Sequence, residues 1–336
     1  MVSIEKLLSC AYYDIFEDDA EKIKSEYRIL VKKYHPDVCS DPRAANVLLK
    51  IQNLYKEAEE HNKNKTWKES NVLSLHRSDG KVALIKNYKY QTSNEMGRIW
   101  VSNTCICYEF ESSKKKYFDN YLIRINSIKY ANEKMREHFF HFIPTILDSF
   151  KAEDKYYIIV KNWPELCPLD LVKDVFKKPE HAAWLTTKIL DICNFLQFNG
   201  LTHNGICAEN CFINFEMHSV HLLGGWQYSV PVETKLLGMP KKVFDNIGIL
   251  IPESKKSQYL LDLSASKDMV RETVGGHSYI KLIDSGFAPL FSEFLFQKPS
   301  EEAFEEYSKW EDIRQRVWSK HEFIKVDTPT GIWVSK

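Results

Sequence analysis

The fold of the N-terminal part of the chain is decided by Tyr27–Asp37, which reads Tyr-Arg-Ile-Leu-Val-Lys-Lys-Tyr-His-Pro-Asp. Apolar residues in this stretch and just before it recur at spacings of four, three and four: Ile23, Tyr27, Leu30 and Tyr34. This spacing places the four side chains on one face of an α-helix. The sequence therefore predicts a helix with one buried apolar face.

The opposite face of this helix is basic, and a proline marks its end. Lys24, Arg28 and Lys32 repeat every four residues and are predicted to form a cationic ridge along the exposed face. Pro36 has no amide hydrogen and disfavours helical geometry at His35, so the helix should end there. The tripeptide His35-Pro36-Asp37 is predicted to form a turn.

A second helix is predicted after this turn. Asp41 can serve as its N-cap and Pro42 as its first helical residue. Its apolar face is expected to comprise Leu48, Ile51, Leu54 and Tyr55. Upstream, residues 4–8 suggest a short helix, and residues 12–16 lead toward the long helix, which begins near Asp19. Two antiparallel helices would thus carry the His-Pro-Asp turn at their tip.

Residues 3–61 resemble a J domain, the module by which DnaJ-type co-chaperones engage DnaK-type heat-shock ATPases. The resemblance rests on four segments: Tyr12–Phe16, Tyr27-Arg28, Lys33–Asp37 and Ile51–Ala58. It implies that the His-Pro-Asp turn stimulates ATP hydrolysis by the partner and that the cationic ridge meets an acidic surface. The residues so assigned are His35, Pro36, Asp37, Lys24, Tyr27, Arg28 and Lys32. A simpler alternative is a helical hairpin that merely needs a proline turn.

Composition narrows the class of protein further. The 336 residues suffice for two or three domains, and 44% hydrophobic with 27% charged residues indicate a globular chain. A formal net charge of zero argues against nucleic acid or an anionic membrane as a partner. No signal segment or membrane span is recognised, so we expect a cytoplasmic protein. The eight cysteines form no Cys-x-x-Cys pair, and no metal site is predicted.

After a polar boundary near residue 65 the pattern changes to short strands. Strands are predicted at four places, 82–85, 99–102, 105–110 and 121–125. A helix over 128–141 and two strands, 145–150 and 156–161, follow. The rest is expected to be mostly helical and to begin with a strong helix over Glu180–Phe198. The predicted domains are 1–64, then 65–163, mainly β with one helix, and 164–336, mainly α.

This order of elements resembles the bilobal protein-kinase fold, and the segment Leu201–Asn210 supports the likeness. His203 and Asn210 have the spacing of the catalytic-loop motif H-R-D-x-x-x-x-N. Two departures stand out: Gly205 occupies the place of the catalytic Asp, and Gly224 that of the metal-binding Asp. Without these two carboxylates, phosphoryl transfer by the usual route is not expected. His203 and Asn210 are then expected to be structural.

The remaining kinase-like positions are also degenerate. The resemblance places Glu133 where kinases keep the glutamate that pairs with a strand lysine, and Arg124, on a predicted strand, in place of that lysine; Lys114–Lys116 are alternatives. The segment Glu95–Ile99 has one glycine where a phosphate loop has several. Asp262 resembles the aspartate that opens a large-lobe helix and caps amides near the catalytic loop. We expect no cofactor, and leave binding of ATP with magnesium open as an alternative.

The sequence is interpreted as a multidomain chain, an all-α J-domain hairpin followed by an α+β kinase-like domain without activity. Its expected partners are a DnaK-type chaperone and a client protein bound by the kinase-like domain. Two alternatives stay open. The chain could be an atypical phosphotransferase that uses displaced residues, or a protein that sequesters the chaperone without stimulating it.

Overall fold

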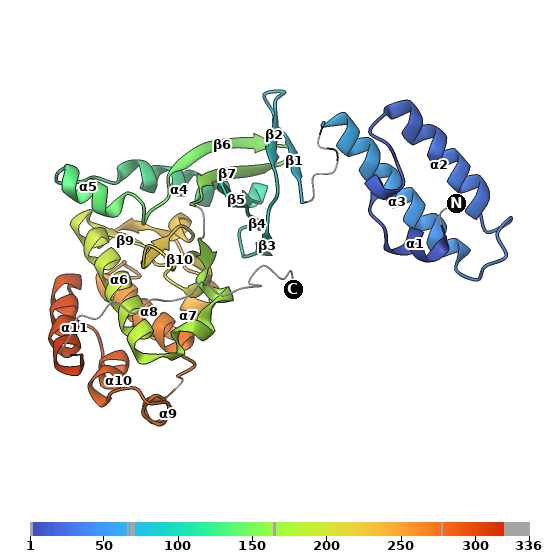
Figure 1. Ribbon diagram of the computed structural model, residues 1–336. Coiled ribbons are helices and arrows are strands. Elements are labelled where there is room, and N and C mark those ends of the chain that lie inside the picture. The colour runs from blue at the N-terminus through green and yellow to red at the C-terminus, as the bar shows by residue number, and fades with distance from the viewer. Residues whose placement is uncertain (1–2, 66, 68–70, 164–165, 277, 319–336) are drawn as a thin grey trace. The chain divides into compact units, whose positions relative to one another are not determined.

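The computed structural model describes residues 3–65, 67, 71–163, 166–276 and 278–318 (Figure 1). The chain divides into two compact units. The first comprises Met1–Ser74 with Leu84–Asn87, and the second comprises Leu75–Ala83 with Tyr88–Lys336. The division falls within two short strands, β1 (Leu73–His76) and β2 (Val82–Ile85).

The first unit is a helical hairpin. Its helices are α1 (Ile4–Ser9), α2 (Ala20–Tyr34) and α3 (Ala44–Lys63), and a 3-10 turn, η1 (Tyr12–Asp14), follows α1. Asp19 caps α2, because its carboxylate accepts the backbone N–H groups of Glu21 and Lys22. The core between α2 and α3 contains Ile23, Leu30, Tyr34, Val47, Ile51 and Leu54. The predicted apolar stripe of the long helix is thus confirmed at three positions, while Tyr27 is only partly buried.

The second helix of the hairpin begins later than predicted. It begins at Ala44, not at Pro42, and the residue before its first turn is Arg43. Asp41 instead stabilises the turn, because its Oδ1 accepts the backbone N–H of Arg43 at 2.8 Å. Its two carboxylate oxygens also accept the Arg43 guanidinium at 3.0 Å each. Asp41 therefore fixes the chain ahead of the helix without capping it.

The second unit contains a five-stranded antiparallel sheet with strand order β3-β4-β5-β7-β6. The strands are β3 (Tyr90–Ser93), β4 (Arg98–Val101), β5 (Cys105–Phe110), β6 (Ile146–Ala152) and β7 (Lys155–Lys161). Four of these were predicted within a few residues, while β3 was not predicted.

Two helices, α4 (Lys115–Ser127) and α5 (Glu133–Phe139), lie between β5 and β6 in the sequence. The predicted strand over 121–125 is therefore wrong, because this segment belongs to α4. The cause is a helical spacing of three, one and three in the residues Phe118, Tyr121, Leu122 and Ile125, all of which pack on the core. The helix predicted over 128–141 is also shorter, since α5 begins only after Asn132, whose side chain caps it.

The remainder of the second unit is mostly helical, as predicted. Its helices are α6 (Pro179–Phe198), α7 (Lys241–Ile247), α8 (Tyr259–Thr273), α9 (Tyr279–Asp284), α10 (Pro289–Phe296) and α11 (Ala303–Val317). The short strands are β8 (Cys167–Pro168), β9 (Leu201–Thr202), β10 (Cys211–Asn214), β11 (Ser219–Leu222) and β12 (Val230–Pro231). The 3-10 turns are η2 (Ser112–Lys114), η3 (Leu169–Leu171), η4 (Lys173–Lys177), η5 (Ala208–Asn210), η6 (Trp226–Tyr228) and η7 (Gly248–Leu250). Helix α6 packs against both α8 and α11 (Figure 1).

The coarse architecture is thus the predicted one, a helical hairpin followed by an α+β region with antiparallel sheets and C-terminal helices. One core joins the sheet and the helices of the second unit, and the hairpin has its own. Among the described helices, none is long and apolar enough to cross a membrane.

Candidate functional site

The His35-Pro36-Asp37 turn follows directly on α2. Helix α2 ends because His35 takes an extended backbone conformation, with φ −63° and ψ 136°. The carbonyl of His35 then accepts the N–H groups of Val38 at 2.9 Å and Cys39 at 2.8 Å. The N–H of Asp37 donates to Nδ1 of His35 at 3.3 Å. The turn is held by local hydrogen bonds, so its backbone has a defined conformation.

The side chains of this turn face solvent. His35 is 44% exposed and Asp37 is 86% exposed, and the carboxylate of Asp37 lies 3.4 Å from Nδ1 of His35. Pro36 is exposed as well. An imidazole and a carboxylate held side by side in the open can both bind one partner surface.

The cationic ridge is also on the outside of α2. Lys24, Arg28 and Lys32 are exposed, and none of them forms an ion pair with another described residue. Tyr27 differs from these three, because its ring stacks on Tyr55 of α3 with centroids 4.0 Å apart. Tyr27 therefore holds the two helices together, and the three cations are free for an acidic surface.

In the second unit, the loop Leu201–Asn210 is held by Asp262 in the first turn of α8. Its two carboxylate oxygens accept the backbone N–H groups of His203 at 2.6 Å and of Asn204 at 2.7 Å. Burial raises the pKa of Asp262 to about 7. Asp262 thus fixes a loop 59 residues away in sequence.

His203 is fully buried in this loop. Its ring meets Trp226 edge to face, with centroids 5.0 Å apart. Burial lowers the pKa of His203 to about 3, and the backbone of Gly224 opposes this only in part. His203 is therefore neutral at physiological pH and acts as a packing residue.

Asn210 is committed to the same framework. Its side-chain Nδ2 donates to the carbonyl of Gly205 at 2.8 Å, and its backbone carbonyl accepts the N–H of Gly224 at 3.0 Å. A Cβ at Gly224 would lie only 2.5 Å from Oδ1 of Asn210. A side chain at Gly224 would therefore require Asn210 to shift from its hydrogen bond with Gly205.

We expect Gly224→Asp to destabilise the second unit by about 1–3 kcal/mol, the usual cost of overpacking a tight interior. It should not create magnesium binding, because the new carboxylate would displace Asn210. Urea denaturation and a melting shift with ATP and magnesium measure the two effects. In the double variant Gly224→Asp/Asn210→Ala part of the stability should return. A fully stable Gly224→Asp that gains a magnesium-dependent shift contradicts the prediction.

Arg124 and Glu133 are not brought together. Arg124 lies on α4, not on a strand, and its Nε donates to Oδ1 of Asn120 at 3.1 Å. Asn120 in turn donates to the carbonyls of Gln227 and Ser229 and so ties α4 to η6. Glu133 is exposed on α5 and pairs with Arg136 at 3.1 Å. The predicted equivalent of the strand lysine is therefore wrong.

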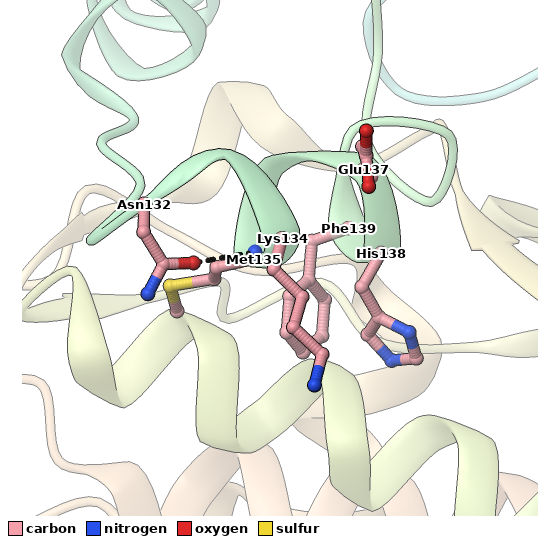
Figure 2. A pocket seen from close by; sticks show the side chains of 6 residues that line it. All are labelled: Asn132, Lys134, Met135, Glu137, His138 and Phe139. Carbon is pink, nitrogen blue, oxygen red and sulfur yellow. Dashed lines mark hydrogen bonds between the residues drawn. The ribbon is translucent and has the colours of Figure 1, made fainter.

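The alternatives Lys114–Lys116 are also not on a strand, since they form η2 and the start of α4. Lys115 pairs with Asp119 one turn along at 2.6 Å. The hollow beside α5, of about 580 Å³, does not contain Glu133 (Figure 2). It is lined only by one short segment: Asn132, Lys134, Met135, Glu137, His138 and Phe139. A hollow bounded by a single helix offers no converging groups, so we assign no site to it.

The segment Glu95–Ile99 covers the end of the β3–β4 turn and the first two residues of β4, and the turn is closed on itself. Oδ1 of Asn94 accepts the N–H groups of Met96 at 2.9 Å and Gly97 at 3.3 Å. Glu95 reaches across to α7, where its Oε1 accepts the N–H of Lys241 at 2.9 Å. The turn thus presents a carboxylate, not free amides, and is unsuited to hold phosphate.

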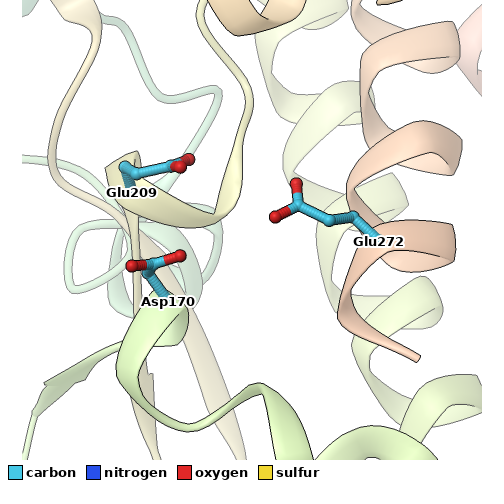
Figure 3. Close-up of side chains that lie close together, drawn as sticks. All are labelled: Asp170, Glu209 and Glu272. Carbon is cyan, nitrogen blue, oxygen red and sulfur yellow. The ribbon is translucent and has the colours of Figure 1, made fainter. Parts of the chain in front are cut away.

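Three carboxylates, of Asp170, Glu209 and Glu272, have oxygens within 4.8 Å of one another (Figure 3). Two lysines pair with them. Lys242 lies 2.7 Å from Glu209 and 2.6 Å from Glu272, and Lys173 pairs with Asp170 and Glu272. The cluster is therefore an ion-pair network that joins η3, η5, α7 and α8, and we assign no metal to it.

Acidification from pH 6.5 to 4 should destabilise the second unit. Burial lowers the pKa of His203 to about 3 and of His221 to about 4, both from 6.5, so the unfolded chain binds two more protons in this window. Asp262, raised from 3.8 to about 7, binds one more proton in the folded chain. From these three groups the difference of one proton predicts a loss of about 1.4 kcal/mol per pH unit, and the lowered pKa values of His141 and His218 add to this loss.

Urea denaturation between pH 7 and 4 measures this slope. His221→Gln should flatten it, whereas His76→Gln, at an exposed histidine, should leave it unchanged. A stability that stays level or rises on acidification in the parent chain would show that the buried histidines do not govern it.

Sequence reasoning missed several residues that the structure places around the loop Leu201–Asn210 and the three-carboxylate cluster. Asn120 and Tyr228 link distant segments, and Lys242 joins two carboxylates. No local motif marks them, because their partners lie far away in the sequence.

No model of a known protein family matches the chain, and no curated protein matches it.

Proposed function

We propose that the chain is a J-domain co-chaperone, which binds a DnaK-type chaperone and stimulates its ATP hydrolysis. The observation that carries the proposal is the exposed His35-Pro36-Asp37 turn, fixed at the end of a helix whose outer face is cationic. The acid and the base of the turn, Asp37 and His35, are both open to solvent. The turn therefore suits an action on the partner's active site better than chemistry of its own.

The two parts of this surface have different physical tasks. Charges on an open helix face raise the rate of encounter and orient the partner, but contribute modestly to affinity. The turn presents an imidazole beside a carboxylate, which can form specific hydrogen bonds after docking. We therefore assign encounter and orientation mainly to Lys24, Arg28 and Lys32, and stimulation to the turn.

The second unit is proposed to be a kinase-like domain without phosphotransfer activity, which recognises a client or partner protein. Gly205 and Gly224 carry no carboxylate, and the space at Gly224 is taken by Asn210. In protein kinases a lysine on the third strand pairs with a glutamate of the next helix. Strand β5 contains no lysine, and α4 contains no glutamate. Tyr108 and Tyr121 instead meet between them, with ring centroids 6.0 Å apart.

The experiment is the steady-state ATPase rate of a purified DnaK-type chaperone with increasing amounts of the full chain. A rate that rises and saturates supports the proposal. No rise at any concentration contradicts it. If the chain co-purifies with the chaperone and the rate does not rise, the sequestering alternative gains. Transfer of labelled phosphate from ATP to a protein would favour the phosphotransferase alternative.

Charge reversal on the ridge should weaken docking without abolishing stimulation. For Arg28→Glu we expect the chain concentration at half-maximal stimulation to rise roughly tenfold, with a smaller change in the maximal rate. Lys56→Glu makes the same change at an exposed position of α3 and is the matched control. The effect of Arg28→Glu should shrink as salt is raised. Equal effects of the two variants would mean that the ridge has no special part in docking.

A further inference from the structure

A cavity of about 380 Å³ lies between the sheet and the helical part of the second unit. Strands β3, β4 and β5 supply one side, and η3, η5, η6 and the start of α7 supply the other. Its volume falls in the range of about 300–1,000 Å³ that small-molecule sites occupy. The action proposed for the His-Pro-Asp turn makes no use of this cavity.

We propose that this cavity binds a small organic amine with an aromatic body. The walls provide the apolar part of such a site. They include the rings of Tyr90, Tyr108, Phe212 and Tyr228 together with Ile99 and Val101. Aromatic walls favour flat ligands and attract cations through the faces of the rings.

Tyr108 adds ring surface to the wall of the cavity. The residue lines the cavity but is only 6% exposed, and its hydroxyl is buried from solvent. A hydroxyl that solvent does not reach is closed to a ligand in a cavity that solvent can enter. Tyr108 therefore serves the aromatic body of the ligand and not a polar group on it.

The charge of the walls selects a cation. Three carboxylates, of Glu95, Asp170 and Glu209, line the cavity together with the ammonium group of Lys242. Behind the lining, Lys173 and Glu272 pair with these residues and add one charge of each sign. Four carboxylates and two ammonium groups leave a net charge of −2. Such a cavity concentrates cations and repels anions.

The same walls disfavour a nucleotide. A phosphate chain needs free backbone N–H groups or unpaired cations. The N–H groups of Met96 and Gly97 are already bonded to Asn94, and Lys242 is bonded to two carboxylates. The carboxylate of Glu95 occupies the β3–β4 turn instead. The ligand class is thus set by charge and not by the likeness to a nucleotide-binding fold.

The test compares two probes of the same shape, tyramine and 3-(4-hydroxyphenyl)propionate, by isothermal titration and ligand-observed NMR on the full chain. Both carry a phenol and a two-carbon arm, which ends in an ammonium group in one and in a carboxylate in the other. Tyramine should bind at least about tenfold more tightly. Absence of tyramine binding, or equal binding of the two probes, overturns the proposal.

Variants locate the binding. Glu95→Gln keeps an acceptor for Lys241 but removes the charge, and should weaken tyramine binding about tenfold. Glu137→Gln, on α5 and away from the cavity lining, should have no effect. Tyr108→Phe keeps the ring and removes only a hydroxyl that is buried from solvent, so it should leave tyramine binding unchanged. If Glu137→Gln lost tyramine binding, or if Glu95→Gln bound tyramine as tightly as the parent chain, the ligand would lie elsewhere and the assignment would be contradicted. These results do not depend on chaperone stimulation, so the two proposals stand or fall separately.

Discussion

Replacing His35 with glutamine is expected to reduce the stimulation of a DnaK-type ATPase to the basal rate, while docking on the ridge is kept. His35 is half exposed and makes only local contacts in the turn, so the hairpin core does not depend on it. Glutamine can accept one hydrogen bond and donate others, but it lacks the flat ring whose Nδ1 lies beside the Asp37 carboxylate. The surface offered to the partner's active site therefore changes while the charges on α2 stay.

The decisive measurements are the ATPase rate and the chain's affinity for the chaperone, taken on the same preparations. We expect the maximal rate to fall and the affinity to change little. His76→Gln makes the same substitution at an exposed histidine outside the hairpin and should stimulate as the parent does. Full stimulation by His35→Gln would remove the ground for assigning the function to this turn. Loss of stimulation in both variants would also count against it.

The turn could be predicted because everything that forms it is local. The apolar spacing of α2, the proline and the cap at Asp19 lie within about twenty residues, and each acts through the backbone of its neighbours. The helix α6 was predicted for the same reason. Its twenty residues carry a long helical pattern and end before Gly200. Local chemistry thus fixed the elements that have long and regular patterns.

The strand assigned to Tyr121–Ile125 failed because a run of five residues, four of them apolar, fits the helical period as well as the strand period. Only the wider window from Phe118 shows the helical spacing, and the burial of Phe118 and Tyr121 against the sheet decides it. The error then carried Arg124 into a wrong role. A short apolar run cannot say which element it belongs to until its packing partners are known.

The geometry of the second unit depends on pairs that no local pattern reveals. Asp262 could be matched to a motif, and its carboxylate does receive two loop N–H groups. The contact of Asn210 with Gly224 and the reach of Glu95 to α7 have no such signal. Both glycines, 205 and 224, were read as lost carboxylates. The structure adds that a Cβ at Gly224 would crowd Oδ1 of Asn210, so a single substitution to aspartate is expected to strain the loop.

The Lys267–Glu306 pair is the feature on which the stability of the helical part should depend most. Lys267 of α8 and Glu306 of α11 are 3% and 1% exposed, with Nζ and Oε1 2.5 Å apart. The other oxygen of Glu306 accepts the N–H of Ser300, and Nζ of Lys267 also donates to the carbonyl of Gln297. Burial lowers the pKa of Lys267 even with Glu306 beside it. Each charge therefore depends on the other.

We expect Glu306→Leu to lower the free energy of unfolding by about 3–5 kcal/mol, because it leaves an ammonium group buried without its counter-ion. Lys267→Met should cost a similar amount by leaving the carboxylate alone. The double variant Lys267→Met/Glu306→Leu should recover most of the loss, since two apolar side chains of similar volume replace a desolvated pair.

Urea denaturation at pH 7 measures the cycle, and pH provides a second test. In Glu306→Leu the buried lysine binds its proton less tightly in the folded chain than in the unfolded one. Its unfolding free energy should therefore rise as the pH increases toward the ordinary lysine value of 10.5, while the double variant lacks this rise. If the double variant lost as much stability as the two single variants together, the pair would not be the interdependent unit that its burial indicates.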